Sequence, residues 1–292
     1  MKRLVITLMV FIILILSGCF YAPTGHLIVS QRGDINKINA ISSCDINPLT
    51  DQPPGSAIEQ VAGLNSKGFT LMNWNMLKGR KTDWKQDFHR FSTISDLIII
   101  QEACLSDDLW EALQENRLNW DLATSFEFEK KKIGVLTASM IEPDYQCAFQ
   151  NEEPLIQIPK HILITRYPLS GTDQKLLVAN VHLINFTLSS SKYRAQLLQM
   201  EQILSKHQGP LIISGDFNSW NNDRLAIVDT ITKRLRLKPV HFDENYRISI
   251  FGHNVDHIYY RGLEPFKAVV SVVTSSDHNP MLVTFRLADN HE

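Results

Sequence analysis

The chain has 292 residues, of which 44% are apolar and 21% are charged, with a formal net charge of −2. This is the composition of a folded globular protein with room for one large domain or two small ones, and it excludes a disordered chain. The charge balance argues against a protein that holds long nucleic acid mainly through phosphate contacts, because such proteins carry a broad basic field.

The first residues have the features of an export signal. The basic start Met1–Arg3 is followed by an apolar run, residues 4–16, which is too short to span a bilayer comfortably and fits the core of a signal peptide. The sequence LSGC at 16–19 resembles the lipobox of bacterial lipoproteins, which implies cleavage before Cys19 and acylation of its thiol. We therefore predict a lipoprotein signal peptide over residues 1–18. An ordinary signal peptide and an uncleaved anchor are the alternatives.

The segment after this cysteine is expected to be a linker. Residue 20 is Phe and not Asp, and by the sorting rule known for enteric lipoproteins this implies a lipid anchor in the outer membrane, facing the periplasm. Residues 19–66 are rich in Ser, Asn, Pro and Gly, so they are predicted to form a flexible tether and lead-in to a catalytic domain over residues 67–288.

Three cysteines remain once Cys19 is lipidated: Cys44, Cys104 and Cys147. An oxidising compartment permits at most one internal disulfide among them, and the sequence leaves all three pairings open. The alternative is that all three stay reduced as small buried residues.

From Thr70 onward, short apolar runs alternate with helical patterns. Each run has the length of a buried strand, and they lie at 70–75, 96–103, 132–139, 161–169, 175–183, 210–218, 255–261, 268–276 and 280–287. Helices are predicted over 107–117, 190–209 and 221–236. Strands that are apolar on both faces need cover on both sides. We therefore expect two packed sheets with helices outside.

Short polar side chains stand at the ends of these runs. Taken singly, each has an ordinary explanation as a turn residue, a cap or a satisfied buried group. Taken together they predict a site, because loops converge at strand ends and clustered carboxylates call for a shared cation. Their oxygen donors favour Mg²⁺, Mn²⁺ or Ca²⁺ over zinc. They are Asn75, Glu102, His182, Asp216, Asn218, Asp256, Asp277 and His278. Gly215 is expected to allow a tight turn at the end of its strand.

The ordered motifs WN, QE, VHL, GDFN, VDHI and SDHNP resemble the signature of the endonuclease/exonuclease/phosphatase superfamily. The stretches QEA, NFTL, GPLIISGDFNSW, YYRG and SDHNP are most similar to its bacterial YafD-like branch. The likeness runs from Thr70 to Leu287. It implies an α/β fold, a four-layer α/β/β/α sandwich of two packed mixed sheets with outer helices. It also implies hydrolysis of a phosphoester by an activated water.

The resemblance assigns a metal side and a reacting side to the site. It implies a divalent cation, Mg²⁺ with Mn²⁺ or Ca²⁺ as alternatives, held by three residues: Asn75, Glu102 and Asp277. On the reacting side, Asp216 would lie against the attacking water and Asn218 would bond a phosphoryl oxygen. His278 would be a base or a phosphate-binding group, oriented by Asp256. His182 would face the phosphate from the other flank.

Three positions depart from the family pattern or have open roles. Deoxyribonuclease-like members carry a phosphate-binding Arg just before a Glu-Pro pair, whereas this chain has Glu152 ahead of Glu153 and Pro154; an acid there would repel DNA. Arg166 matches a family strand and is expected either to bind phosphate or to form a structural ion pair. Trp220, after the GDFN loop, is expected to line the rim or to pack.

The predicted function is that of a divalent-metal-dependent phosphodiesterase, anchored to the cell envelope through its N-terminal lipid. Its substrate would be nucleic acid or a nucleotide, and the protein is expected to be a monomer. One alternative is a phosphodiesterase or phosphatase for a phospholipid or sphingomyelin headgroup. A second is a catalytically inactive envelope binding protein on the same scaffold. The sequence leaves the choice between Asp216 and His278 as the general base open.

Overall fold

The computed structural model describes residues 26–31, 34–38, 44, 62–154, 158–187 and 189–289. The predicted signal peptide, the predicted lipidation site Cys19 and much of the predicted tether lie outside these residues. Among the helices that the structure describes, none is long and apolar enough to cross a bilayer.

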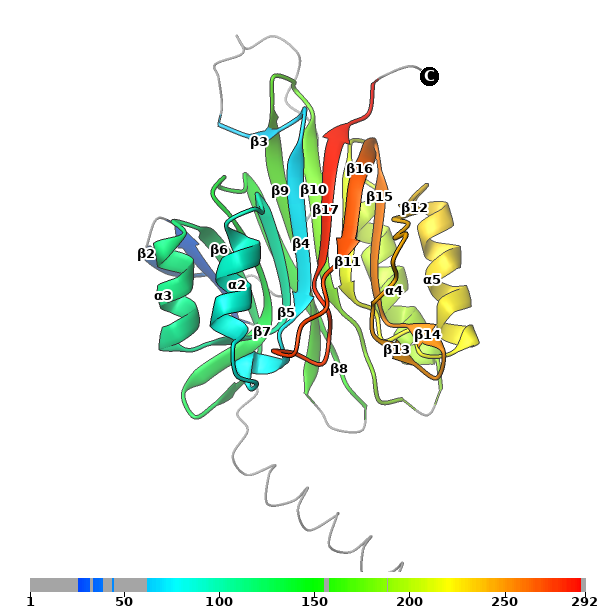
Figure 1. The fold of residues 1–292 in the computed structure, drawn as a ribbon. Coiled ribbons are helices and arrows are strands. Elements are labelled where there is room, and N and C mark those ends of the chain that lie inside the picture. Colours follow the sequence, from blue (N-terminus) through cyan, green and yellow to red (C-terminus); the bar gives the residue numbers. More distant parts are fainter. Residues whose placement is uncertain are drawn as a thin grey trace, which may run out of the picture.

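Two sheets face each other, and each carries helices on its outer side (Figure 1). Helices α2 (Trp84–Ser92) and α3 (Asp107–Glu115) cover the first sheet, whereas α4 (Ser191–Leu204) and α5 (Asn222–Arg234) cover the second. This arrangement confirms the predicted four-layer α/β/β/α sandwich.

The first sheet has eight strands in the order β16-β17-β4-β5-β7-β6-β1-β2. All neighbours in it are antiparallel except β4 and β5, which run parallel. In chain order the strands are β1 (His26–Gln31), β2 (Asp34–Ile38), β4 (Phe69–Asn75), β5 (Leu97–Leu105), β6 (Asn119–Phe128), β7 (Lys131–Ser139), β16 (Leu263–Val270) and β17 (Met281–Leu287).

The second sheet has seven strands, in the order β12-β15-β11-β10-β9-β3 with β8 also paired to β9. Within it β10 and β11 run parallel. Its strands are β3 (Leu64–Asn65), β8 (Tyr145–Glu152), β9 (Pro159–Ser170), β10 (Lys175–His182), β11 (Leu211–Asp216), β12 (Lys238–Pro239) and β15 (Asp256–Arg261). A short hairpin, β13 (Ser249–Ile250) and β14 (His253–Asn254), and a 3₁₀ turn, η2 (Leu77–Gly79), complete the elements.

The period-two alternation of strand side chains explains the layers. In β5, Leu97 and Ile99 join the core between the sheets, whereas Ile98 packs with the helices α2 and α3. In β10, Val178 faces the other sheet and Leu177 packs under α4 and α5. Both sheets are therefore apolar on two faces, as their continuous apolar runs predict.

Several elements differ from the expectation. The lead-in predicted as flexible over 19–66 contributes β1, β2 and β3, and β1 extends the first sheet by pairing with β6. The strand predicted over 268–276 is correct only for residues 268–270, because β16 ends at Val270 and a loop follows. Strands β6 and β8 and helix α2 carry too many polar residues for an apolar-run criterion, and they were not predicted.

The cysteines resolve into one disulfide and one free thiol. Cys44 is bonded to Cys147 of β8, with 5.5 Å between the Cα atoms, and Cys104 is free and half-buried. Of the open alternatives, the structure therefore selects the pairing of Cys44 with Cys147, which ties the lead-in to the second sheet.

Candidate active site

Most of the predicted site residues lie at one edge of the sandwich, at the carboxyl ends of the parallel pairs β4–β5 and β10–β11 (Figure 1). Asn75, His182 and Asp216 each end a strand. Asp256 opens β15, and His278 lies in the loop before β17. The strand order thus brings together residues that are far apart in sequence.

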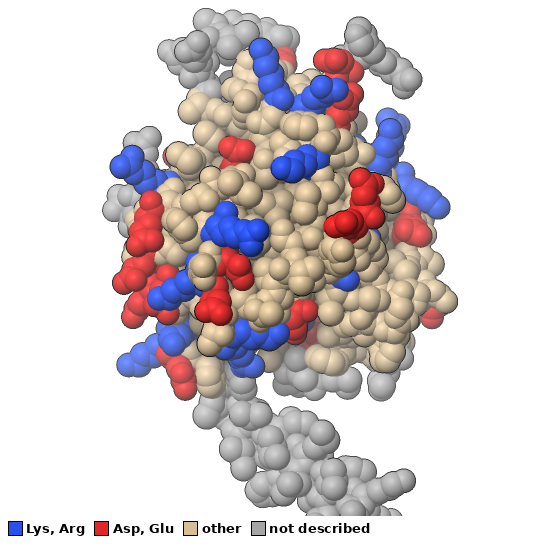
Figure 2. Space-filling view, viewed as in Figure 1, with Lys and Arg blue, Asp and Glu red and all other residues tan. Residues whose placement is uncertain are grey.

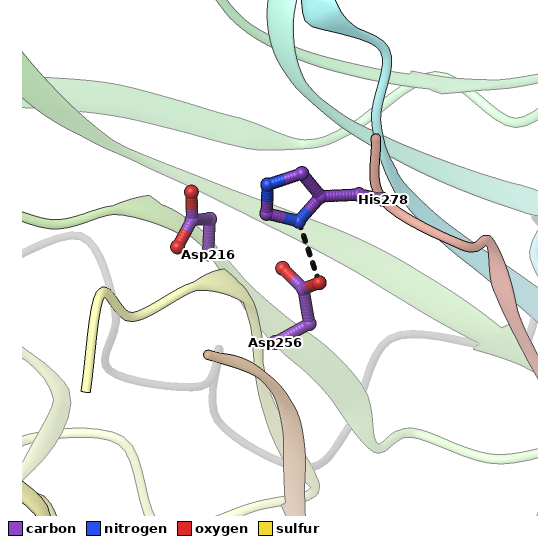
Figure 3. Close-up of side chains that lie close together, drawn as sticks. All are labelled: Asp216, Asp256 and His278. Atoms are coloured by element: carbon purple, nitrogen blue, oxygen red, sulfur yellow. Dashed lines mark hydrogen bonds and ion pairs between the residues drawn. The ribbon is translucent and has the colours of Figure 1, made fainter. Parts of the chain in front are cut away.

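Asp216, Asp256 and His278 form the centre of this cluster and point toward one another (Figure 3). One ligand atom from each of the three lies within 4.8 Å of the others. Asp256 Oδ2 lies 2.7 Å from His278 Nδ1, so the predicted orienting contact is present. Asp256 Oδ1 is buried and has no hydrogen-bond partner among the described residues.

The charges of this trio are set by burial and by each other. Burial alone would lower the pKa of His278, but Asp256, with Asp216 and Asp277, raises it to about 10. His278 is therefore an imidazolium at neutral pH. Burial raises the pKa of Asp216 to about 6, so this carboxylate is ionised at neutral pH and retains the basicity to accept a proton.

Asp216 is held by two donors. Its Oδ1 accepts the main-chain N–H of Asn218 at 2.9 Å, and its Oδ2 accepts Asn75 Nδ2 at 3.2 Å. Asn218 adopts a left-handed φ of 48°, and its side-chain Nδ2 donates to the carbonyl of Leu183 at 2.9 Å. The Asn218 amide is thus bound to the neighbouring loop and keeps one proton for a further acceptor.

Gly215 has a different role from the expected tight turn. Strand β11 continues through Gly215 to Asp216, in register with Val181 of the parallel strand β10. A Cβ atom at Gly215 would lie 2.0 Å from the Val181 carbonyl oxygen, and φ there is +149°. The glycine is required because β10 approaches the backbone closely, and this approach places His182 beside Asp216.

The predicted metal side centres on Glu102. Glu102 lies in a bulge of β5, where the pairing with β7 shifts, and has a left-handed φ of 50°. Its carboxylate forms an ion pair with Lys78 of η2. Burial would raise the pKa of Glu102, but Lys78, Lys160 and His278 outweigh burial and lower it. Asp277 acts on the same imidazolium, since it is among the carboxylates that raise the pKa of His278.

Two residues to which the sequence assigned no role in the reaction lie at the candidate site. The Lys160 ammonium, on a side chain only 13% exposed, donates to His182 Nε2 at 2.7 Å and lies 3.9 Å from Glu153 Oε2. Burial and Lys160 keep the pKa of His182 well below its ordinary value, so His182 is a neutral acceptor. The buried Glu153 also accepts the main-chain N–H of Asn185 at 2.8 Å. A lysine at the start of a strand looks solvent-exposed in the sequence, and this explains the omission.

Arg166 forms the structural ion pair that was considered for it as an alternative to phosphate binding. Arg166 pairs in register with Leu177, five residues and about 17 Å along β10 from His182, and its Nε donates to Asp144 Oδ1 at 2.7 Å. The structure therefore supports the ion-pair alternative. The cationic side chain beside His182 is that of Lys160.

Trp220 combines the two roles considered for it. Its indole Nε1 donates to Asn185 Oδ1 at 2.9 Å, and the buried guanidinium of Arg224 lies 4.5 Å from its ring centroid. The ring remains partly exposed and lies 6.1 Å from that of Phe251. It is therefore a packed residue at the rim of the site.

The residues of the predicted metal side, Asn75, Glu102 and Asp277, fit a hard divalent cation. Their donors are carboxylate and amide oxygens, the ligands that Mg²⁺ and Ca²⁺ prefer. The buried Asp256 Oδ1, which has no hydrogen-bond partner among the described residues, is an acceptor that a cation would satisfy.

Comparison with known proteins gives the same assignment at the level of sequence. A model described as "Endonuclease/Exonuclease/phosphatase family" matches residues 72–278. A UPF0294 protein of Vibrio campbellii (strain ATCC BAA-1116) is 35% identical over 220 residues, which cover 75% of this chain and 78% of that protein. This bacterial relative fits the branch predicted from the motifs.

Solved structures share the fold at low sequence identity. The human Nocturnin catalytic domain with bound sulfate anion is 15% identical with a TM-score of 0.62, covering 78% of this chain and 96% of that chain. ANGEL2, a 2′,3′-cyclic phosphatase, is 16% identical with a TM-score of 0.56, covering 77% and 97%. D. rerio TDP2 complexed with single strand DNA product is 16% identical with a TM-score of 0.54, covering 75% and 99%.

Because the family match spans residues 72–278 and so includes every predicted catalytic and metal-binding residue, the chain belongs to the endonuclease/exonuclease/phosphatase family, whose members are hydrolases acting on phosphoester bonds.

Proposed function

We propose that this protein is a divalent-metal-dependent phosphodiesterase that acts on nucleic acid or a nucleotide in the cell envelope. The observation that carries the proposal is the meeting of Asp216, the Asp256–His278 pair and the Lys160–His182 pair at one strand edge. It combines a carboxylate of raised pKa with two cationic groups, the combination needed to activate water against an anionic phosphoester.

In the proposed mechanism Asp216 accepts a proton from the attacking water. Its orientation is fixed by the Asn218 N–H and by Asn75 Nδ2, so the carboxylate is pre-positioned before substrate arrives. The His278 imidazolium, held by Asp256, donates from its other ring nitrogen to a phosphoryl oxygen. Lys160 adds positive charge on the flank of neutral His182. This assigns the base role to Asp216, because a protonated His278 has no free lone pair to accept a proton.

The proposed cation is Mg²⁺, with Mn²⁺ or Ca²⁺ as alternatives. The residues that would hold it are the predicted ligands Asn75, Glu102 and Asp277, and Asp256 Oδ1, which is unpartnered among the described residues, offers a further acceptor. When bound, a divalent cation neutralises charge on the phosphoryl oxygens and stabilises the leaving oxygen.

Charge supports a small substrate or a short stretch of nucleic acid. Figure 2 shows Lys and Arg interspersed with Asp and Glu over one face, and among the described residues of that face there is no continuous basic field. With a net charge of −2, the protein is poorly suited to bind a long polyanion, so binding must depend on groups inside the site.

An envelope location is supported by the disulfide as well as by the N-terminal sequence. Disulfides persist in oxidising compartments and are rare in the cytosol. The Cys44–Cys147 bond therefore agrees with export through the predicted signal peptide, lipidation at Cys19 and an outer-membrane anchor facing the periplasm. Replacing Cys19 by Ser is expected to release the protein from membranes. Membrane retention with an uncleaved N-terminus would contradict this.

One observation favours the alternative of a lipid-headgroup substrate. The side chain of Phe251, at the tip of the β13–β14 hairpin, is 83% exposed beside Trp220 at the rim of the site. An exposed aromatic residue at such a position suits contact with a lipid surface. This candidate shares the catalytic residues and differs only in what lies beyond the phosphate.

The test is a substrate panel on purified residues 20–292 with Mg²⁺ or EDTA. Bis-p-nitrophenyl phosphate, a dinucleotide, plasmid DNA, RNA and sphingomyelin vesicles would be compared, with Asp216→Asn and His278→Ala as inactive controls. The proposal expects EDTA-sensitive hydrolysis of the first two substrates, lost in both variants. Cleavage confined to sphingomyelin would select the lipid alternative, and equal activity in all three proteins would contradict an enzymatic role.

A further inference from the structure

A layer of buried amides lies directly beneath the site. Asn73 precedes Asn75 by two residues in β4, and Asn180 precedes His182 by two in β10, so each faces the same side as its site residue. Gln101 immediately precedes Glu102 in β5. The side chains of Asn73, Gln101 and Asn180 are at most 1% exposed, in an interior that is otherwise largely apolar.

These amides connect the two sheets through hydrogen bonds. Gln101 Nε2 donates to Asn180 Oδ1 at 2.8 Å and to Asn73 Oδ1 at 3.1 Å. Asn180 Nδ2, which comes from the second sheet, donates to the carbonyls of Leu136 at 2.9 Å and Ile100 at 3.2 Å in the first sheet. Asn180 therefore reaches across the space between the sheets to main-chain acceptors of β5 and β7.

Those acceptors mark the place where β5 departs from regular pairing. Ile100 is in register with Leu136, but the next pair is Ala103 with Gly134, so β5 carries one extra residue there. Ala103 packs on the helix side of the sheet, although regular alternation from Leu97 and Ile99 would place it between the sheets. The extra residue changes the phase of the strand, and Glu102 lies at this bulge.

We propose that Asn180 and Gln101 are positioning residues, which hold the β5 bulge and so direct the Glu102 carboxylate into the site. This inference rests on the proposed function, in which Glu102 is a metal ligand. Without the bulge, Glu102 would follow the alternation of Ile98 and Ile100 and face the helices. Its left-handed φ is a conformation that persists only where the surroundings hold it. Asn180 supplies that constraint from the opposite sheet, and Gln101 links Asn180 to the strand that carries the bulge.

The first test measures metal affinity, a quantity that does not depend on catalytic turnover. Mn²⁺ binding to residues 20–292 would be followed by electron paramagnetic resonance for the wild type, Asn180→Leu and Gln101→Met. We expect Mn²⁺ affinity to fall by about 10- to 100-fold, the usual effect of removing a group that supports a ligand. The control is Leu177→Ala, a fully buried change on the helix side of the same strand. It should lower thermal stability and leave Mn²⁺ affinity unchanged. Unchanged affinity in both amide variants, or an equal loss in the control, would overturn the inference.

A second test reads the geometry directly and does not depend on metal binding. Crystal structures of Asn180→Leu and Gln101→Met are expected to show Glu102 out of its left-handed conformation and its carboxylate away from Lys78. Gln101→Met keeps the volume of a buried chain, so it serves if Asn180→Leu does not fold. An unchanged bulge in Gln101→Met would overturn the inference. A wild type that binds no Mn²⁺ would contradict the proposed function, and the crystallographic comparison alone would then decide the role of the amides.

Discussion

Lys160 and His182 form a contact that gives each residue a defined state. Since the Lys160 ammonium donates to His182 Nε2 at 2.7 Å, the ring must carry its proton on Nδ1. Burial lowers the pKa of Lys160, but Glu102, Glu153 and Asp216 oppose this. The pair therefore combines a buried lysine with a neutral imidazole whose Nε2 is an acceptor, at the edge of the candidate active site.

Replacing Lys160 by Met should weaken phosphoester hydrolysis. A charge-assisted hydrogen bond is worth about 1.5–3 kcal/mol, so kcat/KM on bis-p-nitrophenyl phosphate should fall by about 10- to 100-fold. The pKa of His182, followed by NMR, should rise toward its ordinary value because one of the charges that lower it is removed. Lys85→Met, which removes an exposed ion pair with Asp108, is the control. Unchanged kcat/KM in Lys160→Met would show that Lys160 has no role in hydrolysis.

A second prediction at this scale concerns Gly215. Gly215→Ala would bring a Cβ to 2.0 Å from the Val181 carbonyl at a φ of +149°, so β10 and β11 must separate. We expect a loss of more than about 4 kcal/mol in the free energy of unfolding, measured by urea denaturation. Gly171→Ala shares a positive φ but meets nothing within 4 Å, and should cost only about 1–2 kcal/mol. Equal losses would show that conformational strain alone, without the contact, explains Gly215.

Some of the site residues can be predicted from the sequence, and others cannot. Asp216, Asp256 and His278 stand at the ends of apolar runs, where strand geometry alone predicts that they converge. Lys160 gave no such signal, because its low exposure comes from tertiary contacts with His182 and Glu153. The bulge at Glu102 was equally invisible, since it is fixed by Asn180 of the opposite sheet.

At the scale of elements, the apolar runs predicted the strands that are buried on both faces. Strands β4, β5, β10 and β11 are continuous apolar runs and were predicted, whereas β6 is interrupted by Asp121 and neighbouring polar residues. Helix α2 is too polar to be predicted from an apolar pattern. It is stabilised by Phe88 and Phe91, which pack on the first sheet. Where tertiary packing and not local pattern determines an element, the sequence gives little warning.

The disulfide is expected to stabilise the joined elements appreciably. It closes a separation of 103 residues between Cys44 and Cys147, and a loop of this length corresponds to at most about 5 kcal/mol. The double variant Cys44→Ser/Cys147→Ser should lose about 2–5 kcal/mol in the free energy of unfolding, measured in urea.

Thiol titration provides the check on this pairing. Residues 20–292 contain three cysteines, so the native protein should react with one equivalent of thiol reagent and the reduced, unfolded protein with three. Cys104→Ser should abolish the native reactivity and leave stability nearly unchanged. Three reactive thiols in native protein purified without reductant would contradict the disulfide.

At the scale of the whole molecule, the space between the sheets contains ionisable groups as well as apolar ones. Asp121 of β6 is 1% exposed, and its Oδ1 has no hydrogen-bond partner among the described residues. Burial, with a contribution from Glu142, raises the pKa of Asp121 to about 7. His161 is fully buried, and burial lowers its pKa to about 3. Both groups are therefore neutral in the folded protein over part of the working pH range.

These two groups make stability depend on pH with opposite signs. The folded pKa of Asp121 lies above the ordinary value. The carboxyl group therefore makes its full contribution to the free energy of unfolding below about pH 4, and this contribution is lost as the pH rises through about 7. The folded pKa of His161 lies below the ordinary value, so its contribution is present above about pH 6.5 and is lost as the pH falls. The two slopes overlap between these limits, and the wild-type profile alone does not separate them.

The variant Asp121→Asn isolates one slope, because the histidine contribution cancels in the difference between wild type and variant. The free energy of unfolding of the wild type minus that of the variant should fall as the pH rises from 4 to 8. With the folded pKa of Asp121 at about 7, this decline is at most about 4 kcal/mol. Urea unfolding at each pH would measure it. The exposed Asp173→Asn should show no such trend, and a flat difference for Asp121→Asn would mean that its carboxylate is solvated or paired inside the fold.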